Sequence, residues 1–358
     1  MTKIVCSVVL GLVLLPARAQ ETDDPFLWLE DVEGERALSW VETENEKTVE
    51  VLAAHPRFDE IYQTSLDILN SDERIPYVAI RGQFVYNFWQ DAKNEKGVWR
   101  RTTLDDYVTD SPAWDVILDI DRLATEEGEN WVWKGSSCLY PDYTLCIVNL
   151  SRGGADAVVR REFDTSTKSF VEDGFFVPEA KGSVSWLDEN TLYVGTDFGE
   201  GSLTTSGYPR IAKVWRRGTQ LAEAEVAYEG ESSDVGVWGY VQHTPEATYE
   251  LVVRAETFYD SDVFVRLSDR IVKLDIPRDA TLHQFYRDQM LVELKSDWTV
   301  GGATHPQGAL ISIDFDDFLA GSRDFHQVVV PDERSSLDGI SSTRNLLLVG
   351  MMENVKSA

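Results

Sequence analysis

The sequence predicts an all-β fold, a β-propeller, that follows a short helical arm. From Tyr77 almost to the end of the chain, short runs of alternating apolar and polar residues are separated by turn residues, a pattern typical of β-strands. This turn-then-strand unit recurs at intervals of roughly 40 to 60 residues, close to the length of a four-stranded propeller blade. The 11 Trp, 13 Tyr and 15 Phe also favour strands. A β-sandwich is the alternative, but one sandwich rarely contains about 280 residues of strand.

Composition excludes two classes of partner. The 358 residues include 62 Asp and Glu against 33 Lys and Arg, which gives a formal net charge of -29. A field of this sign repels the phosphate backbone of nucleic acids and the surface of an anionic membrane. Apolar residues make up 43% of the chain, which is ample for a core.

The N-terminus has the three parts of a signal peptide. Lys3 supplies the positive charge, residues 4–15 form an apolar segment, and Ala17-Arg18-Ala19 fits the rule for a cleavage site. The apolar segment is short for a membrane span. We therefore expect residues 1–19 to be removed after Ala19 and the mature protein to be exported, to the periplasm or the extracellular space, with no membrane attachment.

We expect residues 20–72 to form a helical arm that contains two amphipathic helices. We expect residues 73–358 to form a propeller domain built of strands. Apolar residues recur at helical spacing between Asp24 and Asn70, with a second helix beginning near Pro56. A helix is also expected at 118–124, between the first two strand units. The main predicted strands are residues 82–89, 144–150, 182–186, 191–195, 249–254, 289–294, 309–313 and 345–350.

Cys138 and Cys146 remain after signal cleavage. They flank a Pro-Asp turn between two strand-like segments, so the thiols face each other across one hairpin. A cross-strand disulfide and two buried free thiols are equally open. Neither cysteine is expected to be catalytic, because no His is near in sequence.

A series of short blocks runs through most of the chain in a fixed order. The blocks are Asp24-Pro-Phe-Leu-Trp-Leu-Glu-Asp31, Arg74-Ile-Pro76, Val98-Trp-Arg-Arg101, Tyr140-Pro-Asp142, Arg152-Gly-Gly-Ala-Asp156, Thr196-Asp-Phe-Gly199 and Ser206-Gly-Tyr-Pro-Arg210. In order and spacing they resemble the N-terminal part of the prolyl oligopeptidase family of serine peptidases. The first block is the most specific of them.

The resemblance implies a helical arm, a seven-bladed propeller and a C-terminal α/β-hydrolase domain that carries Ser, Asp and His. It also implies that the propeller restricts the active site to short peptides and that cleavage commonly follows Pro. This chain has room for the arm and about six blades, so the propeller is expected to be incomplete and the hydrolase domain to be absent. No Gly-x-Ser-x-Gly nucleophile motif occurs in the sequence. We therefore assign no catalytic residue and expect no activity from this chain alone.

The sequence contains little that indicates a metal site or a cofactor site. The five histidines are dispersed, and neither a His-x-x-x-His nor a Cys-x-x-Cys pair exists, so we expect no metal and no cofactor. Among the histidines, His305 in a Gly-rich loop is the first to inspect. Tyr208 and Arg210 are candidates for a substrate or domain interface, because a Gly-Tyr-Pro turn can present Arg at a propeller face; an ordinary turn with an exposed Arg is equally open.

Three hypotheses follow. The first is the non-catalytic propeller region of an exported peptidase, which gates access and whose partners are short peptides and a hydrolase domain. The second is a free-standing propeller that binds peptides or a protein partner. In the third, a separate chain supplies the hydrolase domain.

Overall fold

The structure is a computed structural model that describes residues 24–31, 34–268 and 270–357. It divides into two compact units, residues 1–71 and 72–358. The predicted signal peptide, residues 1–19, lies outside the described residues. In the described part of the chain, no helix is both long enough and apolar enough to cross a membrane.

The first unit is helical, as the apolar spacing predicts. Trp28 and Trp40 pack edge to face with their ring centroids 6.0 Å apart, and the Arg36 guanidinium lies 4.0 Å from the Trp28 ring centroid. Ala37 is the one buried residue in the helices described for this unit, so the unit has little core of its own. Its helices are η1 (Leu27–Glu30), α1 (Glu35–Ala53) and α2 (Phe58–Asn70).

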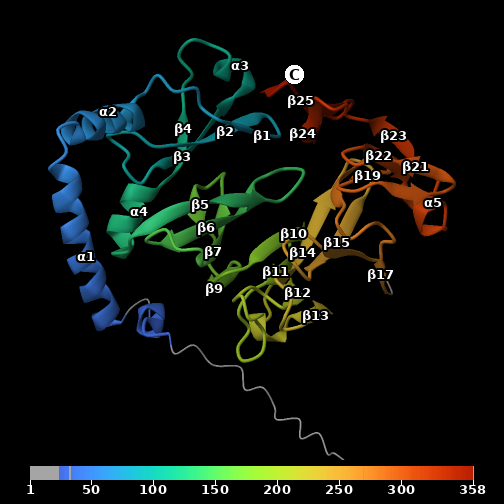
Figure 1. Ribbon diagram of the computed structural model, residues 1–358, viewed down its shortest axis with the longest axis horizontal. Helices are drawn as coiled ribbons and strands as arrows, with labels where there is room; N and C mark the ends of the chain where they lie inside the picture. Colours follow the sequence, from blue (N-terminus) through green and yellow to red (C-terminus); the bar gives the residue numbers. More distant parts are fainter. Residues whose placement is uncertain (1–23, 32–33, 269, 358) are drawn as a thin grey trace, which may run out of the picture. The chain divides into compact units, whose positions relative to one another are not determined.

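In the residues that the structure describes, the second unit contains six antiparallel sheets of three or more strands, which follow one another in chain order, and one two-stranded hairpin (Figure 1). The first is β1 (Ala79–Arg81), β2 (Phe84–Trp89), β3 (Val98–Thr103) and β4 (Asp115–Asp119); the second is β5 (Trp131–Cys138), β6 (Leu145–Arg152), β7 (Val158–Asp164) and β8 (Ser169–Phe170), with β9 (Phe176–Ala180) on β7. The third is β10 (Ser183–Asp188), β11 (Thr191–Gly195), β12 (Ile211–Arg216) and β13 (Glu225–Glu229); the fourth is β14 (Gly236–His243), β15 (Thr248–Ala255), β16 (Ser261–Arg266) and β17 (Ile271–Lys273).

The fifth and sixth sheets complete the unit. The fifth is β18 (Thr281–Tyr286), β19 (Gln289–Glu293), β22 (Leu310–Asp314) and β23 (His326–Val329), with a separate hairpin of β20 (Trp298–Val300) and β21 (Ala303–His305). The sixth is β24 (Ser335–Ser342), β25 (Leu347–Glu353) and β26 (Lys356–Ser357). Short helices lie between strands: α3 (Leu104–Tyr107), α4 (Ile120–Glu127), η2 (Leu221–Glu223) and α5 (Phe315–Leu319).

These sheets form a six-bladed β-propeller, which confirms the predicted fold. The first strands of sheets two, three and four, β5, β10 and β14, lie side by side, which places first strands nearest the common axis. Because every paired strand is antiparallel, connections between first and second strands lie at one face, here called the first-turn face. Connections between second and third strands lie at the opposite face.

The core is divided between neighbouring sheets rather than gathered in one centre. One cluster joins sheets one and two around Trp99 and Phe163, whose ring centroids are 6.0 Å apart. Another joins sheets four and five, where Tyr249 stacks on Phe285 at 3.8 Å. Further clusters join sheets two and three and sheets three and four. Alternation along each strand supplies these contacts on both sides of a sheet.

Each predicted strand overlaps a strand of the structure, but one helix begins later than predicted. Residues 118 and 119 belong to β4, and α4 begins at Ile120. The Asp119 carboxylate accepts a hydrogen bond from Arg122 N at 2.9 Å and so caps the helix, while Gly128 ends it with φ 68°. Leu118 fits the apolar pattern of a strand as well as that of a helix, so the predicted start of this helix was wrong.

Candidate functional site

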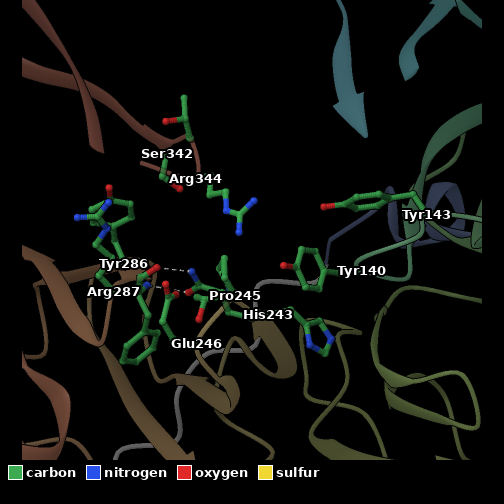
Figure 2. Close-up of a pocket in the computed structure, with 13 residues that line it drawn as sticks. Tyr140, Tyr143, His243, Pro245, Glu246, Tyr286, Arg287, Ser342 and Arg344 are labelled. Carbon is green, nitrogen blue, oxygen red and sulfur yellow. Dashed lines mark hydrogen bonds between the residues drawn. The ribbon is translucent and has the colours of Figure 1, made fainter. Parts of the chain in front are cut away.

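A cavity of about 560 Å³ opens on the first-turn face. Four sheets contribute to it, and because the sheets surround one axis, the cavity lies over that axis. We call it the channel mouth. Its lining comes from residues 140 and 143 of sheet two, 242–246 of sheet four, 285–287 of sheet five and 342–344 of sheet six (Figure 2).

A fixed pair of rings forms one wall of the channel mouth. The Tyr140 and His243 rings are stacked, with centroids 5.8 Å apart and an interplanar angle of 10°. His243 Nε2 lies 3.0 Å from Trp186 O, and His243 Nδ1 lies 3.1 Å from Thr248 Oγ1. A carbonyl only accepts, so Nε2 donates to Trp186 O, and Nδ1 forms its hydrogen bond with the Thr248 hydroxyl. Both ring nitrogens are therefore occupied, and His243 positions Tyr140 rather than acting as a free base.

The hairpin that carries Tyr140 and Tyr143 is closed at its base. A disulfide joins Cys138 and Cys146, which are paired in the register of β5 and β6, with an S–S distance of 2.00 Å. The Arg81 guanidinium donates to Ser136 Oγ at 3.0 Å and to Ser136 O at 3.1 Å. These contacts hold the end of β5 in place beneath the two tyrosines.

Burial changes the acidity of groups around this hairpin. It raises the pKa of the Tyr143 phenol above its usual value; the neighbouring Tyr140 adds to the increase and the Arg81 charge opposes it. Burial also lowers the pKa of Arg81. The Tyr143 phenol therefore stays protonated at neutral pH and can donate a hydrogen bond from its place in the wall.

The floor of the channel mouth is fixed between sheets four and five. Gln242 Nε2 donates to Phe285 O at 3.0 Å, and Phe285 N donates to Gln242 Oε1 at 2.9 Å. The side-chain amide thus pairs with the backbone of the next sheet as another strand would. Phe285 is only 1% exposed. The neighbouring sheets four and five are therefore held in one geometry at this point.

The charged residues of the channel mouth are two arginines and one glutamate, in a protein of net charge -29. Arg287 donates to Asn345 O at 3.2 Å. Arg344 lies in the turn between β24 and β25, is exposed, and has no ion-pair or hydrogen-bond partner in the part of the chain that the structure describes. Figure 2 shows Arg344 extending between the Tyr286 and Arg287 side and the Tyr140 and Tyr143 side.

The comparisons with known proteins agree with this architecture. The family model for the prolyl oligopeptidase N-terminal beta-propeller domain matches residues 17–358. The chain belongs to the prolyl oligopeptidase family. The resemblance read from the ordered sequence blocks is therefore confirmed.

Two curated relatives of the chain carry the name peptidase. The chain is 36% identical over 349 residues to the "Uncharacterized peptidase y4nA" of Sinorhizobium fredii, which covers 95% of this chain and 48% of the relative. It is 26% identical over 381 residues to the "Uncharacterized peptidase RP174" of Rickettsia prowazekii, which covers 100% of this chain and 53% of the relative. The chain therefore spans about half the length of the curated relatives it matches.

The structure is similar to a solved member of the family. It matches a post-proline cleaving enzyme from Rickettsia typhi with a TM-score of 0.86 and 26% sequence identity, over 92% of this chain and 50% of that one. A prolyl endopeptidase of Elizabethkingia miricola is 26% identical over 255 residues.

Within this family propeller, Tyr208 and Arg210 lie on the opposite face, in the connection between β11 and β12. Arg210 Nη1 lies 2.6 Å from Glu229 Oε1, and its other nitrogens donate to Gly201 O at 2.9 and 2.6 Å. The Tyr208 ring centroid lies 6.2 Å from that of Trp238. The structure brings neither residue into the channel mouth, and the donors of Arg210 are used inside its own sheet.

His305, the histidine singled out from sequence, is 3% exposed in β21 and packs against Phe325 at a ring distance of 6.3 Å. It is a core residue. In the part of the chain that the structure describes, no group of three or more His, Cys, Asp or Glu is placed to hold a metal ion.

The residues of the channel mouth were mostly missed by sequence reasoning. Tyr140 and Tyr143 belong to the hairpin between the two cysteines, so that hairpin and the block Tyr140-Pro-Asp142 were the available signals. Arg287 and Arg344 lie in ordinary turns, and only the topology brings them to one cavity.

Proposed function

We propose that this chain is the non-catalytic propeller region of an exported serine peptidase that hydrolyses short peptides, commonly after proline. The observation that carries the proposal is the match of the family model to residues 17–358, supported by the similarity to a post-proline cleaving enzyme. The sequence contains no Gly-x-Ser-x-Gly motif. Catalysis then depends on an α/β-hydrolase domain with Ser, Asp and His, on the same polypeptide or on a separate one.

We further propose that the propeller gates access to that domain. The channel mouth is fixed by the Cys138–Cys146 disulfide and by the Gln242–Phe285 hydrogen bonds. A cavity of about 560 Å³ has room for a few residues of extended peptide. A folded domain of 100 residues, with a radius of gyration of about 13 Å, is far too wide for it. Short unstructured peptides are therefore admitted and folded proteins are excluded.

Two measurements test the proposal. The purified chain should not hydrolyse a fluorogenic Gly-Pro peptide; turnover that a serine-directed phosphonate abolishes would contradict the non-catalytic assignment. Reading the coding sequence beyond codon 358, and the neighbouring genes, should reveal a Gly-x-Ser-x-Gly motif. With the hydrolase domain present, an unstructured Pro-containing peptide should be cleaved, whereas the same segment in an exposed loop of a folded protein should not.

A further inference from the structure

We propose that the channel mouth binds the C-terminal carboxylate of a proline-containing peptide, with Arg344 as the principal cation. This inference rests on the proposed function, in which the propeller admits peptides, and it names the feature of the peptide that the mouth recognises. It is carried by an unpaired guanidinium, an adjoining aromatic wall and an asymmetric distribution of charge.

Arg344 is available to a ligand, whereas Arg254 and Arg217 of the same propeller are already paired. Arg254 is held by Asp234 at 2.7 and 2.9 Å, and Arg217 by Glu162 at 2.8 and 2.9 Å. No carboxylate of the described residues pairs with Arg344. A planar guanidinium presents two parallel donors that match the two oxygens of a carboxylate. Capture of the C-terminal carboxylate is a recurring mode of peptide recognition.

The aromatic wall suits proline. Tyr140 is stacked on His243 and lies at 5.9 Å, edge to face, from Tyr143. Proline-rich segments adopt an extended helix that docks against aromatic rings, and they lose little conformational entropy when they bind. The phenol groups of Tyr140 and Tyr143 point toward the side from which Arg344 extends (Figure 2). A prolyl ring on this wall therefore leaves the peptide carboxylate near the guanidinium.

The surrounding charges favour one orientation of the peptide. A second cavity of about 560 Å³ adjoins the first and shares Tyr140 and His243 with it. It is lined by Asp142, Asp188 and Glu189, so it repels a carboxylate. Across the stacked rings, Arg344 and Arg287 outnumber the Glu246 carboxylate, so the channel mouth attracts the same group. The free C-terminus is thus directed to the arginine side of the wall.

Isothermal titration calorimetry of the chain with two peptides tests this directly. The peptides are acetyl-Ala-Pro-Ala-Pro as the free acid and as the C-terminal amide, so they differ only in the terminal group. We expect the acid to bind about tenfold more tightly than the amide, which is the size of one charge-assisted hydrogen-bond pair at a partly exposed site. In Arg344→Gln this ratio should fall to about twofold or less, and Arg344→Lys should retain part of it.

The matched control is Arg216→Gln. Arg216 is an exposed residue at the end of β12, on the same face and outside the channel mouth, and its loss changes the net charge equally. This variant should keep the preference for the acid. Circular dichroism shows whether Arg344→Gln is folded. If it is not, the ratio of acid affinity to amide affinity measured for Arg344→Lys still tests the role of Arg344.

Three results would overturn the inference: equal affinity of the native chain for acid and amide, an acid preference that survives in Arg344→Gln, or no binding of either peptide. None of these outcomes contradicts the proposed function, because that function is tested separately by peptide hydrolysis in the presence of the hydrolase domain. Conversely, acid-selective binding with no associated peptidase would uphold the channel-mouth site and reject the peptidase assignment.

Discussion

The buried ion pair between Asp234 and Arg254 is expected to be a major local contribution to propeller stability. Asp234 is 1% exposed and precedes β14, whereas Arg254 lies on β15. Arg254 Nε lies 2.7 Å from Asp234 Oδ2, and Arg254 Nη2 lies 2.9 Å from Oδ1. Glu231 N also donates to Asp234 Oδ2 at 2.7 Å. Replacing Arg254 by Met leaves the carboxylate buried with only that backbone donor.

Breaking a fully buried pair in this way costs about 3 to 5 kcal/mol. The side chain of Arg254 is 24% exposed, so water screens part of the attraction, and we expect Arg254→Met to lower the free energy of unfolding by about 2 to 4 kcal/mol. Urea unfolding followed by tryptophan fluorescence at pH 7 measures this. The control is Arg122→Gln, which breaks the exposed pair with Glu126 and should cost about 0.5 kcal/mol or less.

The pH dependence of this difference follows from Asp234. Its hydrogen bonds with Arg254 hold the pKa of the carboxyl below its usual value of about 3.9. A lowered pKa in the folded state stabilises the protein above the unfolded value, and this contribution is lost as pH falls through the folded value. The difference between native chain and Arg254→Met should thus be constant from about pH 5 to 8 and shrink below about pH 4. A difference that is unchanged at low pH, or a loss no larger than that of Arg122→Gln, would refute the reasoning.

Three further predictions concern the channel mouth and the N-terminus. Cys146→Ala should lower the free energy of unfolding by about 2 to 3 kcal/mol in urea titrations, because the disulfide closes a short loop, and dithiothreitol should weaken the native chain but not the variant; a native chain that is insensitive to the reductant would contradict this. Gln242→Leu leaves the N–H and C=O of Phe285 unpaired and should cost about 2 to 4 kcal/mol, whereas Gln63→Leu on the exposed face of α2 should cost about 0.5 kcal/mol or less; equal effects would reject the pairing. Mass spectrometry of the exported protein should give a chain that begins after Ala19, and an intact N-terminus in the cytoplasm would rule out export.

The fold was predictable because its signals are local. Short runs rich in apolar and β-branched residues at 191–195 and 249–254 predict strands without any knowledge of their neighbours, and the structure has β11 and β15 there. The start of α4 was less certain, because Leu118 is apolar in both the strand and the helix pattern. The divided core, with Trp99 facing Phe163 of the next sheet, depends on which sheets are adjacent, and sequence alone shows this only through the spacing of the repeat.

The candidate site was much less predictable, because turn residues carry no periodic signal. The sequence singled out Arg210, whose turn chemistry is distinctive, but the structure uses its donors on Glu229 and on backbone carbonyls. Arg344 lies in a turn without any motif. Its proximity to Tyr140 follows from propeller closure around an axis, which no local pattern encodes.

In this propeller, the residues that we expect to stabilise the fold differ from those that we propose to bind peptide. Asp234 lies in the connection between sheets three and four, and both of its carboxylate oxygens are used by Arg254 within the protein. Arg344 and Tyr140 lie in first turns, where a side chain can change with little effect on the cores between sheets. Gln242 is the exception, because it contributes to the channel mouth and also pairs sheet four with sheet five. Changes at Gln242 should therefore alter both the stability and the shape of the channel mouth, whereas changes at Arg344 should alter binding alone.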